Sequence, residues 1–248
     1  MTRPAVAFVA LLSLALVGCA SAPNAKKDPR DPIEGFNRAS YKFNDALDRA
    51  LLKPAAKGYK AVTPDFVESG VTNFFSNLTQ PTVIINDLLQ GKFKASLNDT
   101  GRFLVNTTVG IGGLFDPASA AGLDRNDEDF GQTLGKWGVP SGAYLMVPFF
   151  GPSTVRDSLG SGVDVFTNPV RYVDDTGVRY GLAGLDLIDS RARRLPLEDT
   201  LNQAFDKYTF IKNAYLQQRE YAVTDGNVPS PKFDDEPLED PDPDADKK

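Results

Sequence analysis

The sequence predicts a mostly α-helical single domain with at most a short β-hairpin. Its 248 residues, 41% of them hydrophobic, are enough for one sizeable core. Apolar residues recur at spacings of three and four, which is the period of an amphipathic helix. Proline and glycine, 18 and 21 residues in all, interrupt these stripes, and strand-like alternation is rare. We therefore expect several helices separated by turns.

The first predicted helix runs from about residue 34 to a proline at position 54. Its apolar stripe, with 4-3-4-4 spacing, consists of Phe36, Ser40, Phe43, Leu47 and Leu51. Two pairs of opposite charge, each four residues apart, lie on another side of the helix: Glu34 with Arg38 and Asp45 with Arg49. Pro54 lacks a backbone N–H group and is expected to end this helix.

Proline and glycine set the bounds of the next four predicted helices. Thr63-Pro64 has the pattern of an N-cap followed by proline at the first helical position, before a stripe that ends at Leu78. Pro81 is expected to open a separate helix that ends at Gly91. A further helix spans about 94–108, and Asp116-Pro117 starts a short one that stops near residue 122.

The second half of the chain contains three more predicted helices and the best strand signal. The helices cover about 152–166, 182–194 and 200–221. The strand signal is the run 144–147, which is bracketed by Pro140 and Pro148. Residues 170–173, before the turn-like run 174–177, form a possible second hairpin arm.

The composition excludes several classes of chemistry. Histidine is absent and cysteine occurs once, so no Ser-His-Asp or Cys-His machinery, histidine metal site or disulfide exists. The net charge of −6 argues against nucleic acid as a partner, because such binding needs a basic face. No residue pattern indicates a cofactor.

Two short motifs invite a catalytic or phosphate-binding interpretation, and both have a plainer one. The run 110–113 is rich in glycine but lacks the trailing Gly-Lys-Ser/Thr of a phosphate loop, so a tight turn is preferred. The acids at 127–129 could serve glycoside cleavage, but adjacent acids point in different directions. We expect them to cap a helix N-terminus.

The N-terminus has the pattern of a lipoprotein signal. A short basic start precedes an apolar run, residues 5–17, which is too short to span a bilayer. The run ends in Leu16-Val17-Gly18-Cys19, which resembles a bacterial lipobox with Cys19 as the lipid anchor. Because Ala20 follows instead of Asp, the pattern favours the outer membrane. We therefore predict a signal peptide over 1–18 and a lipidated tether over 19–32, which is rich in proline.

The C-terminus is expected to be a solvated tail. Residues 225–248 contain nine acids, three lysines and five prolines, so this segment carries the whole net charge of −6. With few apolar residues, it cannot bury enough surface to offset the entropy of ordering. A solubilising role is favoured over an acidic arm for a basic partner. The helical domain then covers 33–224.

The chain resembles the MlaA (VacJ) family of outer-membrane lipoproteins. The resemblance covers most of 31–219, and its strongest block is 128–138, Glu-Asp-Phe-Gly-Gln-Thr-Leu-Gly-Lys-Trp-Gly. Other matching stretches are 31–38, which includes Phe36 and Asn37, then 73–78, 88–92, 102–107 and 148–157. We expect six residues of this region to have structural roles: Phe36, Asn37, Phe43, Asn73, Phe74 and Phe75. The chain departs from the family pattern at two positions: Glu68 stands where a basic residue is expected, and Lys212 stands where an arginine is expected.

The resemblance implies a helical ring that lies in the membrane interface and encloses an amphipathic channel. It implies a lipid-anchored protein on the periplasmic side of the outer membrane, docked against a trimeric porin. Such a protein removes misplaced phospholipid from the outer leaflet. It passes the lipid to a soluble periplasmic carrier of an inner-membrane ABC transporter, without catalysing a reaction. This retrograde transport maintains the lipid asymmetry of the outer membrane.

The resemblance also places a flexible hairpin at the channel near residue 140. Two glycines, a proline and a serine within five residues predict a loop over 138–142. We expect Gly138, Pro140, Gly142 and the adjoining Tyr144 to form a gate, with the two glycines as the hinge. The alternative is a plain connecting turn.

Two other functions are compatible with the residues. One is a structural lipoprotein that bridges the outer membrane and the cell wall. The other is a glycan hydrolase that uses Asp or Glu, which requires two carboxylates at a fixed separation. Exposure of phospholipid on the surface of a deletion strain separates a lipid conduit from both.

Overall fold

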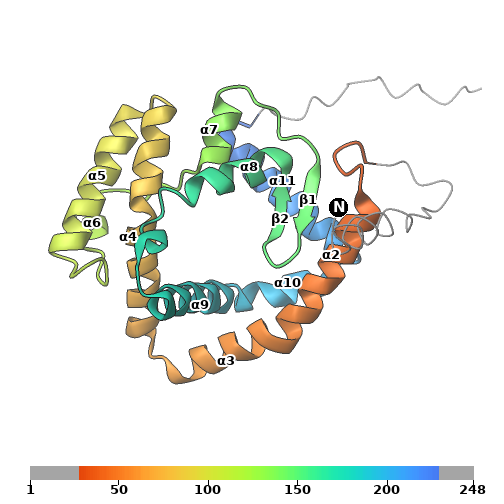
Figure 1. Ribbon diagram of the computed structural model, residues 1–248, viewed down its shortest axis with the longest axis horizontal. Helices are drawn as coiled ribbons and strands as arrows, with labels where there is room; N and C mark the ends of the chain where they lie inside the picture. Colours follow the sequence, from red (N-terminus) through yellow and green to blue (C-terminus); the bar gives the residue numbers. More distant parts are fainter. Residues whose placement is uncertain (1–27, 229–248) are drawn as a thin grey trace, which may run out of the picture.

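A computed structural model describes residues 28–228, which form a ring of helices around a central opening (Figure 1). One half of the ring begins with a continuous helix made of α2 (Glu34–Leu47), the π-helical turn η1 (Asp48–Leu52) and α3 (Lys53–Val62). Thr63 and Pro64 are extended and separate it from the long α4 (Asp65–Leu89). The hairpin of α5 (Phe93–Thr108) and α6 (Pro117–Ala120) lies against the outer side of α4 (Figure 1).

The other half closes the ring with shorter elements. After α7 (Phe130–Lys136), the antiparallel strands β1 (Tyr144–Val147) and β2 (Gly151–Thr154) pair with Tyr144 opposite Thr154. The remaining elements are α8 (Val155–Asp164), the 3₁₀ turn η2 (Pro169–Tyr172), α9 (Thr176–Arg193), the 3₁₀ turn η3 (Leu195–Leu197), α10 (Glu198–Gln203) and α11 (Lys207–Val223). Helix α9 packs along α3 and also contacts α4.

The predicted fold class is confirmed, and several local predictions are confirmed with it. The strand over 144–147 exists with the predicted bounds and forms a hairpin. Asp116 and Asp129 are N-caps, and their side chains accept hydrogen bonds from the backbone N–H groups of Ser119 and Gln132. The acidic run at 127–129 thus contains a helix cap, as its position before an apolar run indicated.

Proline does not end helices where the sequence predicted it would. The first helix continues through Pro54 because the π turn before it shifts the hydrogen bonds, and the Lys53 N–H donates to Asp48 O, five residues back. Helix α4 similarly continues through Pro81. An interior proline costs about 3 kcal/mol, and packing of α4 against α5, α7 and α9 offsets this cost.

Two predictions in the second half are wrong. The run 170–177 is no hairpin arm, because residues 169–172 form a 3₁₀ turn and Asp175 caps α9, which starts earlier than predicted. The predicted helix over 200–221 is broken into α10 and α11. Asp206 causes the break, since its side chain caps α11 and accepts two hydrogen bonds from Arg38 at 3.2 and 2.7 Å.

Polar residues, and not apolar ones, dominate the interior of the ring. Within residues 28–228, eight hydrophobic residues are buried, against twenty polar or charged ones. The apolar core cluster consists of Tyr144, Met146 and Tyr208. Thirty-five large hydrophobic side chains of the same region are exposed, including Phe66 at 78% and Phe115 at 60%. This is the reverse of the distribution in a water-soluble domain.

Candidate functional site

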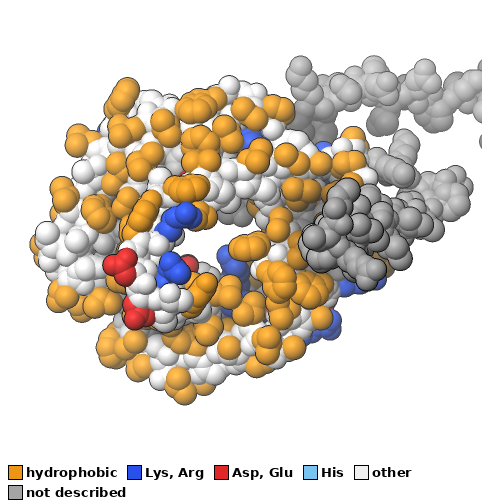
Figure 2. All heavy atoms as spheres, in the orientation of Figure 1, with side chains coloured by type: hydrophobic (Ala, Val, Ile, Leu, Met, Phe, Trp, Pro, Cys, Tyr) orange, Lys and Arg blue, Asp and Glu red, His pale blue; other side chains and the backbone are white. Residues whose placement is uncertain are grey.

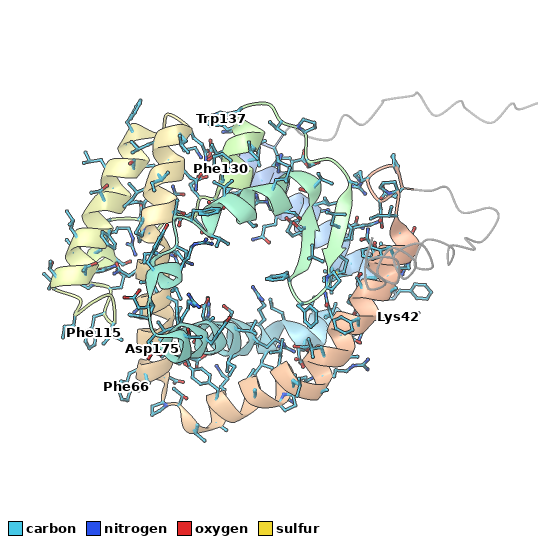
Figure 3. The ribbon with its side chains drawn as sticks, viewed as in Figure 1. Lys42, Phe66, Phe115, Phe130, Trp137 and Asp175 are labelled. Atoms are coloured by element: carbon cyan, nitrogen blue, oxygen red, sulfur yellow. The ribbon has the colours of Figure 1, made fainter. Side chains whose placement is uncertain are left out.

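The central opening is the most conspicuous feature of the surface. Figure 2 shows that it passes through the ring and that Lys and Arg side chains lie at its edge, while hydrophobic side chains cover much of the surrounding face. Figure 3 shows Phe66 and Phe115 on the outer perimeter, pointing away from the opening. The ring therefore places apolar groups outside and charged groups next to the hole.

An apolar pocket of about 400 Å³ lies between α2, the β-hairpin and the end of α9. Its apolar lining includes Tyr41, Met146, Leu197, Leu201, Phe210 and Ile211. Charged groups form its rim, where Arg191 donates to Asp48 at 2.6 and 2.9 Å and also pairs with Glu198. This combination of an apolar wall and a few polar groups is typical of a small-molecule site.

A second, more polar crevice of about 210 Å³ lies between α4 and α9. Hydroxyl groups from α4 line one wall, and Asp186 and Arg193 of α9 line the other. Arg125, from the segment between α6 and α7, and Asn168, from the segment between α8 and η2, complete the lining. Helices α4 and α9 both border the opening (Figure 1), and the end of α9 lines the apolar pocket as well as the polar crevice.

Asn37 is the most constrained of the predicted structural residues. It is fully buried, and its amide nitrogen donates to Asp31 Oδ1 at 2.8 Å and to the carbonyl of Tyr144 at 3.0 Å. Its oxygen accepts from the Met146 N–H at 2.9 Å. Asn37 thus fixes β1 to α2 with all of these bonds shielded from water, where each is costly to lose.

The predicted aromatic residues divide into buried and exposed sets. Phe75 is buried and meets Phe74 edge to face at 5.2 Å, while the neighbouring Asn73 is half-buried. Phe36 is 50% exposed and Phe43 is 44% exposed. The Phe43 ring meets the exposed Phe149 ring edge to face at 5.0 Å, and its exposed part is free to face lipid.

The proposed gate residues do not all border the opening. The loop over 138–142 runs along the outer rim between α7 and β1, and the turn at the other end of the hairpin reaches toward the hole (Figure 1). Gly138 and Gly142 have φ angles of 90° and 69°, which explains glycine at both positions. Pro140 is exposed, and Tyr144 is a core residue with no exposed surface.

The hairpin turn near the opening is held by a residue that the sequence analysis overlooked. Asn44 of α2 donates to the Val147 carbonyl at 3.0 Å and accepts from the Phe149 N–H at 2.8 Å. Phe149 adopts a φ of 70°, which is unfavourable for a non-glycine residue and requires such support. Asn44 lies within the predicted first helix, one residue after Phe43. Its position in that helix gave no sign that it would hold the hairpin turn, because the contact is more than 100 residues away in the chain.

A buried ion-pair network joins α7, α8 and α11. The Arg219 guanidinium donates to Asp157 at 2.9 and 3.1 Å and to Asp129 at 2.5 and 2.9 Å. Burial raises the pKa of Asp129 and Asp157, but hydrogen bonds from Arg219 outweigh it, so both pKa values lie below the ordinary value. The sequence signal was the presence of these acids inside the blocks 128–138 and 148–157.

Two carboxyl groups, Asp87 of α4 and Asp99 of α5, lie fully buried in the outer part of the ring. When both groups are ionised, no donor within the described region reaches either oxygen of Asp99, and Asp87 accepts only at Oδ1, from Asn126 at 3.0 Å. A proton on Asp87 can form a hydrogen bond to Asp99. Burial raises the pKa of both groups, and burial together with Asp99 raises the pKa of Asp87 to about 7. Sequence patterning offered no sign that these two acids meet.

The body extends beyond the predicted domain bounds at both ends. Asp28 and Asp31, which the sequence assigned to the tether, accept hydrogen bonds from the buried Lys212 at 3.1 Å each. Asp225, assigned to the tail, pairs with Lys92 and with Lys136. The predicted signal peptide, Cys19 and the tail after residue 228 lie outside the described residues.

The helices of the described region include none with the length and apolar character needed to cross a membrane.

Comparison with known proteins places this ring in a family. A model of the MlaA lipoprotein family matches residues 29–222. The intermembrane phospholipid transport system lipoproteins MlaA of Haemophilus influenzae and Escherichia coli are each 36% identical, over 230 and 224 residues. Each match covers 89% of this chain. The matches cover 91% of the Haemophilus protein and 89% of the Escherichia protein.

A solved structure has the same fold. It comes from work on the structural basis for maintenance of bacterial outer membrane lipid asymmetry, and it matches with a TM-score of 0.70 at 34% identity. The match covers 78% of this chain and 98% of that chain. With the family model spanning nearly all of the described ring, these similarities establish that the chain belongs to the MlaA lipoprotein family.

Proposed function

We propose that this protein is a lipid conduit that removes misplaced phospholipid from the outer leaflet of the outer membrane and passes it toward the periplasm. The opening would hold the lipid in transit, with no bond made or broken. The names of the relatives, which describe intermembrane phospholipid transport, support this proposal. The solved structure that resembles the ring comes from work on outer membrane lipid asymmetry.

The reversed distribution of polar and apolar residues is the observation that carries the proposal. Hydrophobic side chains such as Leu51, Phe93 and Leu97 are 60 to 74% exposed on several helices, and Phe66 and Phe115 lie on the outer perimeter of the ring (Figure 3). Burying such side chains among lipid tails is favourable by about 25 cal/mol per Å². Backbone groups at that depth need internal hydrogen bonds, which a ring built of helices supplies. The ring is thus suited to lie within one leaflet.

The pockets beside the opening match the two parts of a phospholipid. The apolar pocket with Leu201 and Ile211 is suited to an acyl chain, and the charged groups near it are suited to the polar head. A conduit needs both surfaces, because a phospholipid exposes a charged head and apolar chains at once. The apolar pocket contains three carboxylates, but each is ion-paired with an arginine: Asp45 with Arg49, and Asp48 and Glu198 with Arg191. A glycan hydrolase would instead need one protonated acid and one free carboxylate at a set distance.

The anchoring and the partners also belong to this proposal. Cys19 would carry the acyl chains, with the segment after it as a tether that ends at Asp28, where the described contacts to the body begin. A trimeric porin would hold the ring in the outer membrane, and a soluble carrier of an inner-membrane ABC system would receive the lipid. Several acyl chains anchor far more firmly than one.

The test is made in whole cells of a strain that lacks the gene. A phospholipase added outside the cells hydrolyses only phospholipid in the outer leaflet, and the released lysophospholipid is measured. We expect more product from the deletion strain than from its parent. A parental level would contradict the conduit and leave the structural lipoprotein as the better account.

Complementation with pocket variants sharpens the test. Leu201→Trp should fill the apolar pocket and fail to restore asymmetry. Leu104→Trp is the matched control, because Leu104 is 56% exposed on α5, outside the pockets of the ring wall. Restoration by both variants would show that lipid does not use this pocket.

A further inference from the structure

The polar crevice between α4 and α9 contains charges of both signs beside apolar groups. Its walls include Ser76 and Thr79 of α4, Asp186 of α9, Arg125 and Asn168, together with the apolar Phe75, Leu78 and Leu182. Its volume of about 210 Å³ is roughly half that of the apolar pocket, which is room for a polar group but not for a long acyl chain.

A fully buried carboxylate that does not itself line the crevice fixes two of the residues that do, Thr72 and Arg193. Asp189 accepts hydrogen bonds from Thr72 Oγ1 at 3.0 Å, Tyr59 Oη at 3.3 Å and Arg193 Nε at 3.0 Å. These contacts join α3, α4 and α9. The ion pair with Asp189 also neutralises the charge of Arg193. We therefore do not assign Arg193 to ligand binding. A site on rigid helices is held more accurately than one on loops.

The other polar groups of the crevice have unused hydrogen-bonding capacity. Within residues 28–228, the side chains of Arg125 and Asp186 form no hydrogen bond or ion pair. Asn168 accepts from the Val170 N–H through its oxygen at 2.9 Å, which leaves its amide N–H groups free to donate. Burial raises the pKa of Asp186, although Arg193 opposes this effect. A partly desolvated carboxylate gains from a cationic partner.

We propose that this crevice binds the headgroup of a zwitterionic phospholipid, namely a phosphate ester that carries a primary ammonium group. Arg125 and the Asn168 amide would bind the phosphate, with the Ser76 hydroxyl as a further donor. Asp186 would bind the ammonium group. This site rests on the proposed conduit function and adds headgroup selectivity to it, because an anionic lipid without an ammonium group leaves Asp186 unpaired.

The experiment measures lipid binding to the full-length lipoprotein in detergent micelles. The probes are short-chain phosphatidylethanolamine and short-chain phosphatidylglycerol at equal concentration. We expect the wild-type protein to prefer the zwitterionic lipid, and Asp186→Asn to reduce that preference about tenfold, as expected for one lost charge-assisted hydrogen bond. Binding of the glycerol lipid should stay unchanged. Asp174→Asn, at an exposed acid just before α9 and outside the crevice, is the matched control.

A second variant tests the phosphate end of the site. Arg125→Gln changes an exposed loop residue and should weaken both lipids to a similar degree, because both contain the phosphate. Equal preference for the two lipids in the wild-type protein would overturn the proposal, as would an unchanged preference in Asp186→Asn with folding intact by circular dichroism.

Soluble competitors distinguish a lipid headgroup from a free metabolite. Displacement of the bound lipid by millimolar phosphoethanolamine, and not by ethanolamine or inorganic phosphate, would support the headgroup chemistry. Binding of phosphoethanolamine by a protein that binds neither lipid would overturn the lipid assignment. The two proposals fail separately, since surface phospholipid in the deletion strain tests transport, and the Asp186→Asn preference tests this site.

Discussion

The buried pair Asp87 and Asp99 leads to a stability prediction with an unusual sign. Because the folded state raises the pKa of Asp87 from 3.8 to about 7, it keeps a proton that the unfolded chain has already released. Unfolding then releases that proton, so the free energy of unfolding falls as pH rises from about 4 to about 7. Each pH unit in this window is worth about 1.4 kcal/mol, so Asp87 alone contributes on the order of 4 kcal/mol.

Replacing Asp99 with Asn should remove the part of this effect that Asp99 contributes, while burial still raises the pKa of Asp87. The amide has nearly the same shape and can donate a hydrogen bond to the Asp87 carboxylate, which needs a partner once it is ionised. We expect Asp99→Asn to stabilise the protein at pH 8 by about 1–3 kcal/mol, the cost of a buried unsatisfied polar group. At pH 5, where the wild-type pair holds a proton, the gain should be much smaller.

The surroundings of the pair favour this reading of the pH dependence. Lys92 lowers the pKa of Asp87 and Glu128 raises it, while Arg102 lowers the pKa of Asp99. The pKa of Asp116, beside Arg102, is lowered to about 2, so this carboxyl group stays ionised across pH 5–8.

The assay is denaturant unfolding of the full-length lipoprotein in micelles, followed by circular dichroism at pH 5 and pH 8. Asp124→Asn, at an exposed loop acid, serves as the control. At each pH, the free energy of unfolding of the wild-type protein is subtracted from that of the variant, and the two differences are compared. A variant less stable than the wild-type protein at pH 8, or an equal gain at both values, would refute the shared-proton account.

The remaining predictions concern the anchor, the hairpin turn, the loop and the tail. Cys19→Ser should abolish outer-membrane fractionation and lipid asymmetry, and wild-type fractionation would refute the lipobox. Phe43→Ala should cost about 1 kcal/mol, less than a fully buried Phe, because Phe43 is 44% exposed and loses mainly its contact with Phe149, whereas Lys42→Ala should have no effect on unfolding. Gly138→Pro cannot keep the φ of 90° and loses the N–H bond to the Gly135 carbonyl, so it should shift the loop; if the loop is a gate, surface phospholipid should rise while porin association is retained, and normal asymmetry would make it a plain turn. Truncation after residue 228 should leave thermal unfolding unchanged, because Asp225 and its ion pairs to the body are retained.

Several features of this protein could be predicted from short stretches of sequence. Helix class, the strand over 144–147 and the caps Asp116 and Asp129 depend on neighbours within about four residues. The pairs of Glu34 with Arg38 and Asp45 with Arg49 form as predicted, at 2.6 Å each, for the same reason. The family could also be identified, because its motifs are contiguous blocks.

The candidate site depended on contacts between residues far apart in the chain. Asp186 and Arg125 meet in one crevice only because α9 packs against α4, and Asn37 holds a strand more than 100 residues away. Proline positions misled the prediction at Pro54 and Pro81, since tertiary packing and a π turn outweigh a local preference of a few kcal/mol.

The sequence by itself thus determined what is local: the helical class, the hairpin, the family and the expected lipid anchor at residue 19. Only the tertiary structure decided which acids and bases are buried together and that apolar side chains such as Phe36 and Phe43 are left about half exposed. The physical reason is that helical periodicity reveals which residues share a face but not what that face meets. In this protein most buried side chains are polar, and many apolar side chains stay exposed. Only packing between distant helices closes the ring around its central opening.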